Sequence, residues 1–233
     1  MISKLLSLGV FLIGIATWPV QAETVKVGRA TIELPAGNWQ ALTTTEGKTL
    51  LDGGASGTVP TEDRAFVLMS DNQIIAILNV SSSKGGARLR TNWVNTCTGT
   101  DTVYALSLTT NPNVLECAQA TAALKTEVFL KLVMPNVLKA VEDNRFTLPS
   151  IVQFISATVG NSNGSSLHVS LLAVPTFTGL QSVENLNVPA RVKPGHAAWA
   201  RELVLAVKAS VYSLSGKMAV PPVVFAAPSS TSQ

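Results

Sequence analysis

Residues 65–80, AFVLMSDNQIIAILNV, carry the pattern that decides the fold. Two runs of β-branched or large apolar residues, 65–69 and 74–80, flank the polar segment SDNQ. Asp and Asn tolerate the positive φ angles of a tight turn, so the stretch predicts a β-hairpin. The second run is apolar at every position from 74 to 78. Because side chains alternate between the faces of a strand, we expect this strand to be central and covered on both sides.

Shorter strand signals occur on both sides of this hairpin. Residues 24–34 alternate with a one-residue slip at Gly28, which we interpret as a β-bulge. Further strand pairs are expected at 103–108 with 114–118 and at 151–159 with 167–174.

The clearest helix is expected at 196–214, with Gly216 placed to end it. Its apolar stripe consists of Trp199, Leu203, Ala206, Val207, Val211 and Leu214. Residues 121–134 fit either a helix or a strand, because short apolar runs do not separate the two. Pro135 must end or kink any helix there.

Together these elements predict an α+β fold, an antiparallel sheet of hairpins with helices packed on it, including a long C-terminal amphipathic helix. We expect a single domain over residues 23–218. Residues 219–233 contain three prolines and a Ser-Ser-Thr-Ser stretch near the end, so they are expected to form a flexible tail.

The first 22 residues have the organisation of a cleavable secretory signal peptide. Lys4 precedes an apolar run of about a dozen residues, 5–16, and Val20-Gln21-Ala22 resembles a cleavage site. The run is shorter than the ~20 residues that cross a bilayer, and no other run approaches that length, so no transmembrane segment is expected after cleavage. The sequence therefore predicts a periplasmic or secreted protein.

The two cysteines, Cys97 and Cys117, are expected to form a disulfide, because an even count in an exported chain favours pairing. Two thiols alone cannot complete a zinc site, and neither histidine has ligand spacing from them. No metal site and no cofactor motif is recognised.

Charge is sparse, with 17 Lys and Arg against 14 Asp and Glu. Such a balance gives no field that would favour nucleic acid as a partner. Lys84, Arg88 and Arg90 form a local cationic cluster. The cluster is either a solvated loop or a contact for an anionic glycan, a lipid headgroup or an acidic partner.

Residues 160–164, GNSNG, match the serine-hydrolase pattern G-x-S-x-G. The chemistry requires a strand-to-helix turn, and a strand is expected to follow here, so a hairpin turn is favoured. Ser162 with His168 as its base is retained as an alternative.

The leading hypothesis is a non-enzymatic binding or accessory protein of the cell envelope or outside the cell. Its expected partner is an envelope protein or an anionic glycan.

Overall fold

The computed structural model describes residues 23–52, 58–70, 72–85, 92–93, 97, 102–180 and 193–226. The predicted signal peptide, Arg88, Arg90 and residues 227–233 lie outside this part of the chain. The elements in chain order are β1 (Thr24–Val27), β2 (Ala30–Glu33), β3 (Trp39–Asp52), β4 (Thr58–Ser70), β5 (Gln73–Ser83), β6 (Asn92–Trp93), β7 (Thr102–Ser107), β8 (Leu115–Lys125), α1 (Thr126–Val133), α2 (Pro135–Asp143), β9 (Ile151–Gly160), β10 (Ser166–Ala173), α3 (Pro194–Tyr212) and β11 (Lys217–Ala219).

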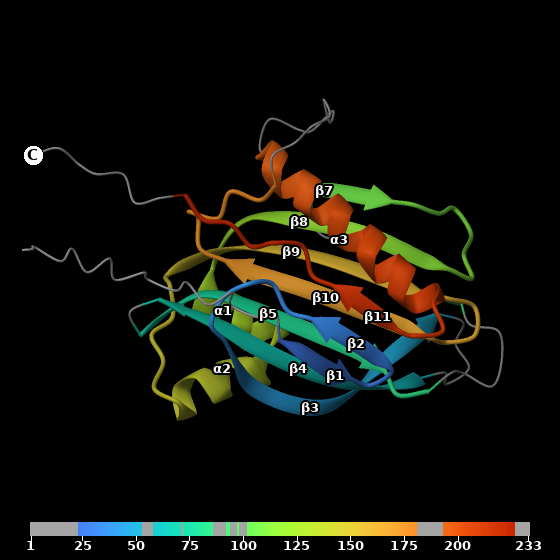
Figure 1. Cartoon of the computed structure of the whole chain (residues 1–233), viewed down its shortest axis with the longest axis horizontal. Coiled ribbons are helices and arrows are strands. Elements are labelled where there is room, and N and C mark those ends of the chain that lie inside the picture. The colour runs from blue at the N-terminus through green and yellow to red at the C-terminus, as the bar shows by residue number, and fades with distance from the viewer. Residues whose placement is uncertain are drawn as a thin grey trace, which may run out of the picture.

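The main sheet is antiparallel and has the strand order β6-β3-β4-β5-β10-β9-β8-β7 (Figure 1). Four hairpins of consecutive strands, β3–β4, β4–β5, β7–β8 and β9–β10, account for most of it, and they include the strand pairs expected at 103–108 with 114–118 and at 151–159 with 167–174. Strands β1, β2 and β11 form a second, small sheet in which β11 runs parallel to β2. The predicted α+β class, with an antiparallel sheet of hairpins and a long C-terminal helix, is confirmed.

The hairpin at residues 65–80 forms as the sequence predicts. Ser70 pairs with Gln73, and Asn72 adopts a φ of 63° in the turn between them. Strand β5 lies between β4 and β10. Leu78 belongs to the apolar core on one face of the sheet, and Ile77 belongs to the core on the other face. The two-faced apolar run is therefore a central strand.

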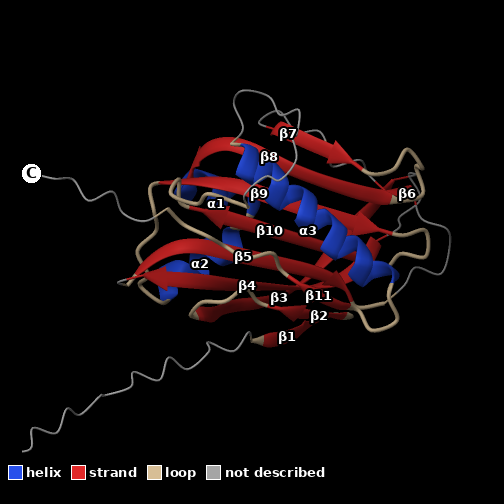
Figure 2. Cartoon of the chain, turned by 45° about the horizontal axis from the view of Figure 1, so that its top comes forward, coloured by secondary structure: helices blue, strands red, loops and turns tan. Residues whose placement is uncertain are grey.

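Each face of the main sheet has its own cover. Helix α3 and the small sheet lie on one face, and α1 and α2 lie on the other (Figure 2). The α3 side holds the larger core, which runs from Val27 to Val220 and includes Trp199 and Leu203. The smaller core joins Leu130 of α1 and Val141 of α2 to the sheet. Alternation of side chains along the strands supplies both cores.

The stripe expected on the C-terminal helix is correct except at its end. Trp199, Leu203 and Val207 are fully buried, and Ala206 and Val211 pack at the edge of the core. Leu214 is fully exposed instead, because α3 ends at Tyr212 and Leu214 belongs to the turn that leads to β11. Helical periodicity does not extend past the last helical residue.

The ambiguous region is divided between a strand and two helices. Residues up to Lys125 belong to β8, and the helix α1 follows at once. Pro135 is the first residue of α2. Backbone N–H groups in the first turn of a helix have no intrahelical acceptor, so the missing N–H of proline costs no hydrogen bond there. Of the range 121–134, residues 121–125 are thus strand and residues 126–133 are helix.

The slip at Gly28 is a reversal of the chain, and our interpretation of it as a β-bulge is wrong. Strands β1 and β2 pair antiparallel around the two-residue turn Gly28-Arg29, with Val27 opposite Ala30. Gly28 has a φ of 52°. A glycine in this conformation serves a two-residue turn as well as it serves a bulge, so the sequence pattern alone did not distinguish them.

The predicted disulfide joins Cys97 to Cys117 on β8, with a Cα–Cα distance of 5.5 Å. Both cysteines belong to a small cluster with Trp93 and Leu115.

The residues directly after β11 were expected to begin a flexible tail, but they pack against the rest of the fold. Val220 is buried, and the indole of Trp199 donates a hydrogen bond to the carbonyl of Pro222 at 3.0 Å. The N–H of Thr178 donates to the carbonyl of Val224 at 2.9 Å. Part of the segment 220–226 is therefore packed against the fold, although composition predicted a flexible tail from residue 219.

Candidate functional site

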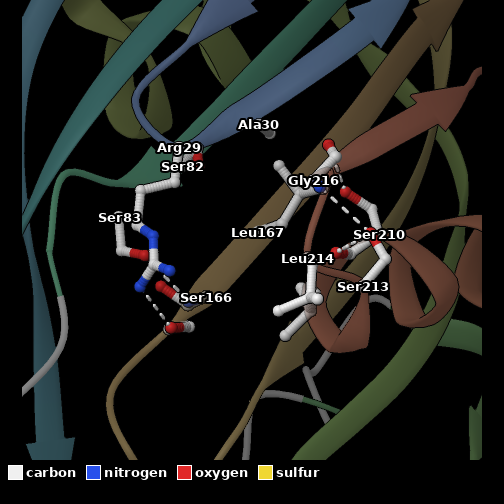
Figure 3. A pocket seen from close by; sticks show the side chains of 12 residues that line it. Arg29, Ala30, Ser82, Ser83, Ser166, Leu167, Ser210, Ser213, Leu214 and Gly216 are labelled. Atoms are coloured by element: carbon white, nitrogen blue, oxygen red, sulfur yellow. Dashed lines mark hydrogen bonds between the residues drawn. The ribbon is translucent and has the colours of Figure 1, made fainter.

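A small open pocket of about 110 Å³ lies where three turns meet on the α3 side of the sheet. The turns connect β1 to β2, β9 to β10 and α3 to β11, and the end of β5 completes the wall. The lining residues are Arg29, Ala30, Ser82, Ser83, Ser165, Ser166, Leu167, Ser210, Val211, Ser213, Leu214 and Gly216. Arg29 is the only charged residue among them. Figure 3 shows it beside Ser83 and Ser166, with Ser210, Ser213 and Leu214 on the opposite side.

Two glycines bring these turns into contact. A Cβ atom on Gly28 would lie 2.6 Å from the carbonyl oxygen of Ser82. A Cβ atom on Gly216 would lie 2.6 Å from the carbonyl oxygen of Arg29. Both glycines have positive φ angles, 52° and 61°. Any side chain at either position would meet both a steric and a conformational penalty, so the pocket depends on this close backbone approach.

Backbone hydrogen bonds fix Arg29 at the junction. The backbone N–H of Arg29 donates to the carbonyl of Ser83 at 3.2 Å. Two residues further on, the N–H of Thr31 donates to the carbonyl of Gly216 at 3.0 Å. The same Gly216 carbonyl accepts from the hydroxyl of Ser210 at 2.8 Å. The position from which the Arg29 side chain projects is therefore set by the sheet and by the end of α3.

The guanidinium of Arg29 has a neutral partner. Its Nη1 donates to the hydroxyl of Ser165 at 2.9 Å. No carboxylate of a described residue forms an ion pair with it. A guanidinium carries five N–H donors in a planar fork and stays charged at all physiological pH values. Most of the donor capacity of Arg29 is thus available for an anionic group.

Serine hydroxyls line both sides of the pocket, and they differ in the hydrogen bonds that they make. The hydroxyl of Ser83 accepts from the amide of Ser166 at 3.0 Å, and that of Ser210 is held by Gly216. The hydroxyls of Ser82 and Ser166, both on buried residues, have no hydrogen-bond partner among the described residues. Each serine hydroxyl is both a donor and an acceptor. The pocket therefore combines one positive charge, the Arg29 guanidinium, with several serine hydroxyls. This combination suits a polar molecule that carries a negatively charged substituent.

The GNSNG segment is a hairpin turn between β9 and β10. The side chain of Asn161 accepts from the amides of Asn163 and Ser165, at 3.2 and 3.1 Å. Gly164 has a φ of 83°. The turn connects two strands, and so it lacks the strand-to-helix geometry of a nucleophile elbow. The turn places Ser165 within hydrogen-bond distance of Arg29.

Both histidines take part in the packing. Nδ1 of His168 lies 2.7 Å from the hydroxyl of Thr158, and desolvation lowers the pKa of His168 to about 4. His196 donates from Nε2 to the carbonyl of Phe177 at 2.9 Å and stacks on the ring of Phe177. Burial also lowers the pKa of His196. Ser162 forms no hydrogen bond with His168, whose Nδ1 is taken by Thr158.

The cationic cluster expected at residues 84–90 is described only at Lys84. The ammonium of Lys84 forms an ion pair with Glu46, which raises the pKa of Lys84 and lowers that of Glu46. Lys84 follows Ser83 of the pocket directly. Arg88 and Arg90 lie outside the described residues, so an anion contact by the whole cluster stays a prediction.

The pocket itself was missed by sequence reasoning. Arg29 and Ser165 are separated by 136 positions, and serines in turns carry no distinguishing pattern. Gly28 and Gly216 were the available signals, since each needed a positive φ.

Within the described ranges, no three His, Cys, Asp or Glu residues could hold a metal ion together. No helix in the same ranges is long and apolar enough to cross a membrane.

No protein-family model, no curated protein and no solved structure matches this chain.

Proposed function

We propose that the protein works outside the cytoplasm, in the periplasm or after secretion, as a non-enzymatic binding or accessory protein. We further propose that it binds an anionic glycan through the Arg29 pocket. The leader-like pattern of residues 1–22 and the Cys97–Cys117 disulfide support export, because disulfides persist in oxidising compartments. The single observation that carries the binding proposal is the guanidinium of Arg29, which has a hydroxyl partner and no carboxylate partner among the described residues.

The size and lining of the pocket favour one charged substituent of a larger molecule. A volume of about 110 Å³ cannot enclose a drug-sized ligand, for which pockets of roughly 300 Å³ and above are usual. A carboxylate or sulfate matches the planar fork of a guanidinium. The free hydroxyls of Ser82 and Ser166 can then bond to neighbouring sugar hydroxyls. The exposed Leu214 supplies an apolar edge for a sugar ring.

Binding to immobilised oligosaccharides tests this proposal. Sulfated or uronate-containing chains are compared with neutral chains of the same length. The purified exported protein should be retained by the anionic chains only, and Arg29→Gln should lose most of that retention. Arg64→Gln is the matched control, because Arg64 is already paired with Glu62 at 2.8 Å. Equal retention on neutral chains, or unchanged retention of Arg29→Gln, would overturn the proposal.

The serine-hydrolase alternative is tested separately. Wild type and Ser162→Ala are compared on a panel of ester and peptide substrates. Turnover that depends on Ser162 would replace the binding proposal with a hydrolase.

A further inference from the structure

Helix α1 carries the densest group of exposed apolar side chains on the described surface. Val128, Leu132 and Val133 are 54%, 77% and 56% exposed, and the neighbouring Ile151 is 44% exposed. Thr126 and Leu130 lie on the side of the helix opposite Val128 and Leu132, and they are buried in or beside the smaller core. Val133, the last residue of α1, lies near the line of Thr126, so the apolar strip consists of Val128 and Leu132. The helix thus holds its place with one side and presents an apolar strip with the other.

A charged strip runs beside the apolar one. Successive helical residues are rotated by about 100°, so Glu127 and Lys131 share one line and Val128 and Leu132 share the next. Neither Glu127 nor Lys131 forms an ion pair with a described residue. The charged strip has one acid and one base and is therefore neutral as a whole.

A shallow groove lies at the start of α1. It is lined by Lys125, Glu127, Val128 and the segment 148–151, and its volume is about 430 Å³. The amide of Thr126 donates to the carbonyl of Ser150 at 3.1 Å, which fixes the two walls relative to each other. The volume of the groove leaves room for an aliphatic side chain from outside.

We propose that this surface binds a second copy of the same chain, with the two α1 helices antiparallel about a two-fold axis. Such an axis keeps the charged strips of both copies on the same side and reverses the helix direction. If the two-fold axis passes between residues 129 and 130, Glu127 of one copy is displaced by about 1.5 Å, measured along the helix, from Lys131 of the second copy. The second pair is equivalent by symmetry. The surface is complementary to itself in charge.

The same axis fits the apolar strip to the groove. Leu132 of each copy comes to the level of Glu127 of the other, where the groove opens. The protruding side chain and the depression are thus both present on one surface, as an isologous contact requires. The proposed contact uses a few side chains of α1 and the groove, whereas a standard interface buries roughly 800 Å² per partner. We therefore expect the association to be weak and to depend on concentration. The contact is on the sheet face opposite the Arg29 pocket and does not rest on the proposed function.

Sedimentation equilibrium of the purified exported protein tests this dimer. The average mass of wild type should rise with concentration from one chain toward two. Leu132→Asp should remain at one chain, with its circular dichroism unchanged because the side chain is exposed. Leu205→Asp, an exposed leucine on α3, is the control and should associate as wild type does.

Charge exchange tests the orientation. Glu127→Lys and Lys131→Glu each place like charges opposite one another and should weaken association by about tenfold or more. An equimolar mixture of the two variants restores both opposite-charge pairs and should dimerise again. Wild type at the mass of one chain at every attainable concentration would overturn the proposal. So would single variants that associate as wild type does, or a protein that stays monomeric and instead floats with anionic lipid vesicles through the α1 strip.

Discussion

Nζ of Lys208, on α3, lies 2.7 Å from Oε2 of Glu116, on β8, whose side chain is only 5% exposed. The other carboxylate oxygen of Glu116 accepts from the hydroxyl of Tyr212 at 3.2 Å. Burial, and then the neighbouring carboxylate, raise the pKa of Tyr212 to about 12. The three residues fasten the long helix to the strand that also carries Cys117. From periodicity alone, Lys208 would be assigned to the solvent side of the helix.

Lys208→Ala should therefore be destabilising. Removal of the ammonium leaves a buried carboxylate with only the Tyr212 hydroxyl, at a cost of about 1–3 kcal/mol. Lys139→Ala is the matched control, because Lys139 pairs with Asp143 on the exposed surface of α2 and such solvent-exposed pairs contribute little to stability. Urea unfolding of the two variants measures the difference. Equal stability would mean that Glu116 is adequately solvated without Lys208.

Stability should fall when the pH is lowered from 6.5 toward 4, partly because of His168. The pKa of its imidazole is about 4 in the folded protein, against 6.5 as the ordinary value. Between these two pH values the unfolded chain binds a proton at His168 and the folded chain does not, which favours unfolding. Urea unfolding at several pH values, with His168→Asn alongside, isolates this contribution from that of the carboxylates. A pH dependence as steep in the variant as in wild type would contradict it.

Leu203→Ala should cost roughly 2–5 kcal/mol, the range for a buried leucine that leaves a cavity. Leu203 is fully buried between α3 and the sheet. Glu202→Ala, one position away on the exposed side, should stay within about 0.5 kcal/mol of wild type. Denaturant melts of both variants provide the comparison. An unaffected Leu203→Ala would mean that α3 is not held by its apolar stripe.

The purified protein should contain no free thiol, because Cys97 and Cys117 are bonded to each other. The bridge closes a loop of about twenty residues, worth roughly 3 kcal/mol on the chain-entropy model. Reduction should lower the melting temperature and leave the far-ultraviolet circular dichroism of the sheet intact, since both large cores lie elsewhere. Thiol titration under denaturing conditions measures the first expectation; two reactive thiols per chain would refute it.

Local patterns were sufficient to predict much of the fold. The run at 74–78, the turn at Asn72 and the stripe on α3 are each determined by neighbours in sequence, and all three are found in the structure. The failures concern choices that a local pattern leaves open. Gly28 permits a bulge or a reversal, and only the packing of the turn against Ser82 selects the reversal.

The candidate site depends on contacts that no local pattern contains. Arg29 and Ser165 meet because three turns pack together, with Gly28 and Gly216 allowing the approach. Lys208 similarly reaches Glu116 across 92 positions. Sequence periodicity distinguishes buried from exposed sides of an element, but it does not show which polar groups from distant elements will be neighbours.

The Arg29 pocket is tested most directly by nuclear magnetic resonance of the isotope-labelled protein during titration with a sulfated disaccharide. Our account predicts saturable shifts of the Arg29 side-chain Nε–Hε signal together with the amide signals of Ser83, Ser165 and Gly216. The amide signals of α1, on the opposite face of the sheet, should stay in place. A neutral disaccharide should cause no saturable shift. Saturable shifts confined to other parts of the molecule, or an Arg29 signal unchanged at every ligand concentration, would contradict the account.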